Sequence, residues 1–157
     1  EESAVPVACT HANARSTFEH VRNKEDATLR RLAERGGVVG ANAFPLFLRR
    51  GYESDVEDFV DVIDQLVGLL GIDHVGIGTD FTQDQPKAFF DWLFMQQGTK
   101  PQDNPVPHPM AHPKGLETPA DFPHLADALL RRGYGAEGTQ KVLGGNWLRL
   151  FEEVWGG

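Results

Sequence analysis

The sequence predicts an α/β fold that forms the C-terminal part of a (β/α)8 barrel. Short apolar stretches alternate with helical patterns in the order strand, helix, strand, helix, strand, and the connections are short. Such an order predicts a parallel sheet with right-handed crossovers. Three strands cannot close a barrel, and an open parallel sheet needs its faces and edges covered. We therefore expect residues 1–157 to be one portion of a single barrel domain, completed by an N-terminal half that is not in this chain.

The first strand–helix–strand unit spans residues 5–44. Residues 5–10 are mostly apolar and predict a buried strand. Asn23 is a candidate N-cap for a helix over residues 24–35, and Gly36 is a candidate stop in the left-handed conformation. Residues 37–44 are rich in β-branched and small side chains, which favours a second buried strand.

The next helix has the clearest signals in the chain. Ser54 and Glu57 have the spacing of a capping box. Apolar residues then recur at helical spacing as far as Leu70, and Gly71 follows at the stop position. Residues 75–81 predict a third strand.

Residues 82–115 interrupt the alternation, because they are rich in Pro, Gln, Asn and His. We expect a long loop or insertion there, with a functional or interface role. Its aromatic cluster could line a substrate mouth or pack against another subunit, and the size of the cluster favours the interface. The cluster comprises Phe89, Phe90, Trp92 and Phe94.

Three helices are expected after this segment. Thr118 caps the first of them, with Pro119 in its first turn, and this helix ends near Gly133. Two short helices follow over residues 136–143 and 146–155, separated by a Gly-Gly pair.

Composition narrows the function classes. The formal charge of −8 argues against nucleic acid and anionic membranes as partners. The single cysteine, Cys9, excludes an internal disulfide and is expected to be a small core residue. No apolar run approaches the roughly 20 residues that span a bilayer. No signal peptide is visible, so the compartment stays open, with the cytoplasm slightly favoured.

Two ionisable residues follow predicted strands, at the edge where parallel sheets bind ligands. His11 follows the first strand and Asp80 ends the third. Neutral imidazole binds zinc, and a nearby carboxylate can exchange protons with water at the metal. This pair is typical of a metal-assisted hydrolase. On pattern alone, a hydrogen-bonded structural histidine and a turn-capping aspartate remain alternatives.

Several ordered segments resemble the renal (membrane) dipeptidase family, peptidase family M19. The most specific is Ile-Asp-His-Val-Gly-Ile-Gly-Thr-Asp-Phe at 72–81. Thr-His-Ala-Asn-Ala-Arg at 10–15, Val-Arg-Asn at 21–23 and Arg-Gly-Gly-Val-Val-Gly-Ala-Asn at 35–42 are similar to earlier segments of the family. Residues 115–125 and 141–151 match its closing helices.

The resemblance implies a zinc-dependent dipeptidase that hydrolyses the peptide bond of dipeptides with a metal-activated hydroxide. It implies two Zn²⁺ ions per complete active site, with His11 as a zinc ligand. Asp80 matches the catalytic residue that handles the proton, and Arg22 matches the residue that binds the substrate carboxylate. The family's other zinc ligands have no counterpart here, so this chain alone is predicted to be inactive. Family members are often dimers, which makes a homodimer possible.

Other interpretations stay open. The chain could be a non-catalytic binding or interaction module that retains half of a hydrolase barrel. Arg22 could be an ordinary exposed arginine, and His20 is expected to be polar surface. The remaining histidines are expected to be incidental or structural: His108 and His112 in the long loop, and His74 and His124 at packing or hydrogen-bonding positions.

Overall fold

The computed structural model describes residues 3–100 and 111–156 and contains a three-stranded parallel sheet. The strands β1 (Ala8–Cys9), β2 (Val38–Ala41) and β3 (Val75–Ile77) lie in the order β1-β2-β3. Both pairings are parallel. The predicted parallel sheet is therefore confirmed, although each strand is shorter than the sequence suggested. Only part of each apolar stretch is paired in the sheet.

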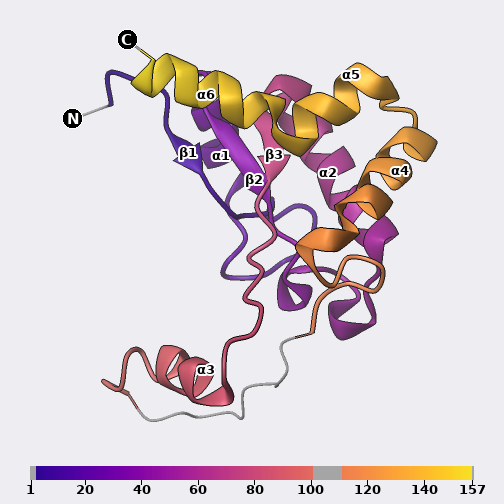
Figure 1. Ribbon diagram of the computed structural model, residues 1–157. Coiled ribbons are helices and arrows are strands. Elements are labelled where there is room, and N and C mark those ends of the chain that lie inside the picture. The colour runs from indigo at the N-terminus through magenta and orange to yellow at the C-terminus, as the bar shows by residue number, and fades with distance from the viewer. Residues whose placement is uncertain (1–2, 101–110, 157) are drawn as a thin grey trace.

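The helices α1, α2 and α6 pack against this sheet (Figure 1). The helix α6 crosses one end of the sheet, whereas α3 lies beyond the carboxyl end of β3. The helices are α1 (Asp26–Ala33), α2 (Val56–Leu70), α3 (Lys87–Phe94), α4 (Phe122–Arg132), α5 (Gly135–Gln140) and α6 (Asn146–Trp155). Short helical turns are η1 (Pro45–Phe47), η2 (Gly51–Glu53), η3 (Ile72–His74), η4 (Pro119–Asp121) and the π-turn η5 (Lys141–Gly145).

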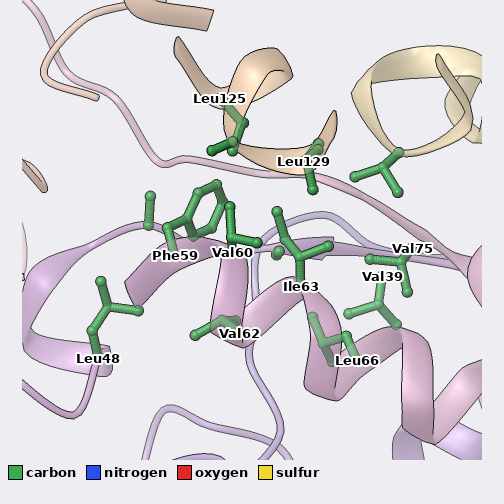
Figure 2. Close-up of a cluster of buried hydrophobic side chains, with 14 of the residues drawn as sticks. Val39, Leu48, Phe59, Val60, Val62, Ile63, Leu66, Val75, Leu125 and Leu129 are labelled. Carbon is green, nitrogen blue, oxygen red and sulfur yellow. The ribbon is translucent and has the colours of Figure 1, made fainter. Parts of the chain in front are cut away.

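The hydrophobic core is centred on α2, which packs between the sheet and α4 (Figure 2). Phe59, Ile63 and Leu66 of α2 are fully buried. Figure 2 shows Val39 and Val75 of the sheet beside Ile63, and Leu125 and Leu129 of α4 above the same face of the helix. The helical periodicity in the sequence therefore identified the buried face of α2 correctly.

The N-terminal cap of α2 differs from the predicted one by a single residue. The Asp55 side chain accepts hydrogen bonds from the amides of Glu57 (3.0 Å) and Asp58 (3.2 Å). In return, the Asp58 carboxylate accepts from the Asp55 amide at 2.8 Å. Ser54 instead lies outside the helix, where its carbonyl accepts from the Lys114 amide. The capping box is thus Asp55–Asp58, and the assignment to Ser54 and Glu57 is wrong because both pairs have the same three-residue spacing.

Asn23 is not the N-cap of α1, which begins at Asp26 after a Glu25 that makes no side-chain cap. The Asn23 side chain is buried and donates to the carbonyls of Phe18 (2.8 Å) and Phe47 (3.3 Å). It therefore joins two loops at the carboxyl end of the sheet, because long-range carbonyl partners are available to it there.

The prediction that the first strand is buried is wrong for this chain. Ala8 is exposed, Cys9 is only partly buried, and Val5 and Val7 are 46% and 44% exposed. The reason is that β1 has a neighbour on one side only among residues 3–100 and 111–156.

The segment 82–115 is not a loop throughout, because it contains α3. Pro86 precedes this helix, and Lys87 pairs with Asp91 at helical i,i+4 spacing. The far end of the segment is anchored to α2, since Lys114 exchanges backbone hydrogen bonds with Ser54 and Val56. Residues 101–110, which include His108, lie outside the described residues.

The predicted start and stop of the later helical segment are confirmed. Thr118 caps η4, which continues into α4, and Gly133 ends α4 in the left-handed conformation with φ 99°. The Gly-Gly pair lies in η5, where Gly144 interrupts the helical geometry. None of the helices in the described part of the chain has both the length and the apolar character to cross a membrane.

Candidate active site at the carboxyl ends of the strands

Two buried asparagines fasten the segment after β1 to the end of β2. Asn13 donates to the Asn42 carbonyl at 2.9 Å, and its side-chain oxygen accepts from the Asn42 amide at 2.8 Å. The Asn42 side chain in turn accepts from the Phe44 amide. Both side chains are almost fully buried, so these bonds are protected from water. They fix the backbone that carries His11 and the turn that follows β2.

Glycines allow the end of β1 to lie against β2 and β3. A Cβ atom at Gly78 would come within 3.1 Å of the His11 Cα and closer still to the Thr10 carbonyl. A Cβ at Gly40 would meet the same carbonyl and, at 3.1 Å, the Trp147 ring. In addition, the Ala12 amide donates a hydrogen bond of 2.9 Å to the Gly40 carbonyl, which holds the segment after β1 against β2. His11 is thereby brought near the end of β3.

The His11 imidazole is exposed, and its Nδ1 lies 2.9 Å from the Thr10 hydroxyl. This contact orients the ring and engages one of its two nitrogens. A histidine whose second nitrogen is held in this way is suited to metal binding, because the contact fixes the direction of the ring and leaves Nε2 available.

Asp80 has an unusual backbone conformation, with a positive φ of 63°. This left-handed region is uncommon for residues other than glycine, and aspartate tolerates it better than most. Backbone conformations of this kind concentrate at functional sites, where the surrounding fold holds them in place. The turn after β3 therefore fixes the direction in which the Asp80 carboxylate leaves the backbone.

Aromatic rings position Arg22. Its guanidinium lies over the Phe47 ring, 5.4 Å from the centroid. The His20 ring packs against Phe47 at 5.0 Å, and its Nδ1 accepts a hydrogen bond from the Arg22 amide. A cation above an aromatic face is stabilised by the ring quadrupole. His20, expected to be polar surface, therefore supports Arg22 on the side of the cavity.

One cavity of about 490 Å³ brings together all three residues predicted from the sequence. His11 comes from the end of β1, Arg22 from the loop before α1, and Asp80 from the turn after β3. His11 and Asp80 also line a neighbouring cavity of about 470 Å³. The rest of the first cavity is lined by His20, Phe44, Leu46, Phe47, Thr82, Phe90, Leu93 and Phe94.

His112 is a residue whose position the sequence did not reveal. Its ring meets the Phe81 ring edge-on at 4.7 Å, and its buried Nδ1 has no hydrogen-bond partner among the described residues. Burial lowers the pKa of His112, while the charges of Asp80 and Glu117 act in the opposite direction. It therefore lies within electrostatic reach of Asp80, although it is not among the residues that line the cavity. No sequence signal marked it, because prolines surround it in an irregular segment.

The other singled-out side chains lie outside the cavity. The His74 ring hydrogen-bonds to the Gly37 carbonyl at 2.9 Å, and the His124 ring to the Gly115 carbonyl at 3.2 Å. Both histidines therefore have the hydrogen-bonding role expected of them. Burial raises the pKa of the Cys9 thiol, with an opposing effect from Lys24, which disfavours the reactive thiolate.

The described residues supply few metal ligands by themselves. Within 3–100 and 111–156, no group of three or more His, Cys, Asp or Glu side chains is placed to hold a metal ion. The fold and the cavity define an α/β protein with its candidate site at the carboxyl ends of parallel strands, the location typical of α/β enzymes.

Comparison with known proteins identifies the family. The model of the membrane dipeptidase family (peptidase family M19) matches residues 1–96 and 109–155. The chain belongs to peptidase family M19. The expectation drawn from the sequence motifs is therefore confirmed.

Individual relatives agree with this family. Dipeptidase tcpJ of Claviceps purpurea is 29% identical over 97% of this chain and 30% of its own length. A Pseudomonas aeruginosa amidohydrolase has a similar structure, with a TM-score of 0.91 and 37% identity over 99% of this chain and 47% of its own. A Rhodobacter sphaeroides metallopeptidase, solved with a phosphinate mimic of L-Ala-D-Ala, is also similar, with a TM-score of 0.75 and 28% identity. The match covers 98% of this chain and 37% of the metallopeptidase chain. The chain thus spans less than half of each.

Proposed function

We propose that this chain is the C-terminal half of a zinc-dependent dipeptidase, and that an N-terminal half completes both its (β/α)8 barrel and its active site. The observation that carries this proposal is the single cavity lined by His11, Arg22 and Asp80. These residues come from three separate segments and match the motif positions predicted to ligate metal, bind the substrate carboxylate and move the proton. Membership in a dipeptidase family supports the same reaction.

Exposed apolar surface supports the completion by a second half. Leu148, Phe151 and Trp155 of α6 are 64%, 41% and 73% exposed. The rings of Phe151 and Trp155 stack on one another at 4.8 Å, so they form a continuous apolar strip. Together with the edge of β1 that pairs with no strand in the described part of the chain, this strip is surface that a soluble domain ordinarily buries. Packing of the missing half against it would cover both.

His11 fits the role of a zinc ligand, and it requires partners. Its Nδ1 is engaged by the Thr10 hydroxyl, which leaves Nε2 for a metal. Each zinc ion takes about four ligands, so two ions need further side chains from the N-terminal half. When bound, zinc supplies a Lewis acid and a nucleophile that is active at neutral pH.

Asp80 and Arg22 have the two other roles in the proposed reaction, proton transfer and substrate binding. The Asp80 carboxylate takes the proton of the attacking water and gives it to the nitrogen of the departing amino acid. The Arg22 guanidinium binds the carboxylate of the substrate, for which its planar fork is suited. Because Arg22 is held by its ring contact with Phe47, the substrate is bound in one orientation.

The test is to co-express the chain with an N-terminal half and to measure zinc content and hydrolysis of a dipeptide panel. We expect two zinc ions per assembly, and His11→Ala should lose about one of them. Asp80→Asn should keep both zinc ions and lower kcat by about 10²–10⁴-fold. Asparagine is chosen because it also tolerates a positive φ.

His124→Ala is the matched control, since this exposed histidine lies outside the cavity and should leave zinc content and turnover unchanged. An assembly that folds but binds no zinc and hydrolyses no dipeptide would instead support the alternative, a non-catalytic interaction module.

A further inference from the structure

The cavity that contains His11, Arg22 and Asp80 also has an apolar wall. One part of the wall comes from the turn after β2, with Leu46 and Phe47. The other part comes from α3, which contributes Phe90, Leu93 and Phe94.

The α3 residues share one face of the helix. Phe90, Leu93 and Phe94 have the spacing i, i+3, i+4, so they point in the same direction. Phe90 is almost fully buried, whereas Leu93 and Phe94 are 42% and 47% exposed. Leu46, on the opposite part of the wall, is 41% exposed. The cavity therefore retains apolar surface that a ligand can still bury.

The positions of the polar residues decide which part of a substrate meets this wall. In a dipeptide, the scissile nitrogen and the terminal carboxylate belong to the same residue, the C-terminal one. If Arg22 binds the carboxylate while His11 and Asp80 face the scissile bond, this residue lies between them. Its side chain then lies in the same cavity as the apolar wall.

We propose that the wall formed by α3 and the turn after β2 is the pocket for the side chain of the substrate's C-terminal residue, and that it selects apolar side chains. The inference rests on the proposed dipeptidase function and names its substrate class. Burial against the wall favours Leu and Phe over Gly, because apolar surface leaves water. Charged side chains such as Asp and Lys are disfavoured, because they lose hydration there without gaining a partner in the wall.

The test uses the complete zinc-loaded assembly and dipeptides with a constant N-terminal Ala and a C-terminal Gly, Leu, Phe, Asp or Lys. We expect kcat/KM to be at least about tenfold higher for Leu and Phe than for Gly, Asp or Lys. Leu93→Ser and Phe94→Ala should lower this preference about tenfold through KM, with kcat and the Gly substrate changing less than about twofold.

Trp92→Ala is the matched control on the same helix. Trp92 is 44% exposed, similar to Leu93 and Phe94, but it does not line the cavity. It should leave the preference unchanged. Equal effects of Leu93→Ser on the Gly and Leu substrates, or a wild-type assembly without an apolar preference, would overturn the inference while leaving dipeptidase activity intact.

A binding measurement separates this inference from the reaction. Calorimetry with phosphinate dipeptide mimics that end in Leu or Gly requires no turnover. Tighter binding of the Leu mimic, lost in Leu93→Ser and kept in Trp92→Ala, supports the pocket even if no dipeptide is hydrolysed. Equal binding of the two mimics counts against the pocket even if hydrolysis occurs.

Discussion

Replacement of Gly78 by alanine is expected to lower the free energy of unfolding, because the new methyl group clashes with the backbone next to His11. The new Cβ would lie 3.0 Å from the Thr10 carbonyl carbon, 3.1 Å from the His11 Cα, and closer still to the Thr10 carbonyl oxygen. All three are backbone atoms, so no flexible side chain can move aside. The His11 backbone or β3 must shift, although hydrogen bonds to β2 hold both segments.

We expect Gly78→Ala to cost about 3 kcal/mol, at the upper end of the range for overpacked sites. With a urea m-value of about 1.5 kcal/mol/M, the unfolding midpoint should fall by about 2 M. The assay is urea unfolding of the chain followed by circular dichroism.

Gly68→Ala is the matched control, because Gly68 lies within α2 and the space that a new methyl group would occupy there is open. Alanine there should raise stability by about 0.5–1 kcal/mol through its higher helix propensity. The reasoning is refuted if Gly78→Ala unfolds within about 0.3 M of the wild type while Gly68→Ala is stabilised as expected.

Three further outcomes are expected. Asn146→Ala should cost about 2–4 kcal/mol in urea unfolding, because it removes a part-buried hydrogen bond to the Ile72 carbonyl and a buried one to the carbonyl of Val75, the first residue of β3. Asp55→Ala should cost about 1 kcal/mol by loss of the α2 cap, whereas Ser54→Ala should change stability by less than about 0.5 kcal/mol; the reverse order would restore Ser54 as the cap. In NMR titration, His112 should have a pKa below its ordinary value, because burial disfavours the charged ring. Its contribution to stability is then present above about pH 6.5 and lost as the pH falls toward the folded-state pKa, and a His112→Phe variant should lack this dependence.

The sequence by itself determined the local features of this protein. Helical periodicity identified the buried face of α2, and the caps at Thr118 and Gly133 were predicted correctly. These features depend on residues a few positions apart, so a single stretch of sequence contains the whole signal. The same locality explains the error at α2, where Ser54 and Asp55 offer overlapping capping patterns and a distant contact of Ser54 with Lys114 accompanies the choice of Asp55.

The positions after predicted strands singled out His11 and Asp80, and the family motifs added Arg22, but only the tertiary structure decided how these residues meet. His11 and Asp80 share a cavity because parallel pairing brings the ends of β1 and β3 to one edge, with glycines allowing the close approach. The apolar wall from α3 and the place of His112 beside Phe81 also depend on contacts between residues far apart in the chain. Such contacts leave no periodic pattern in the sequence, because the two side chains in each contact come from distant segments of the chain.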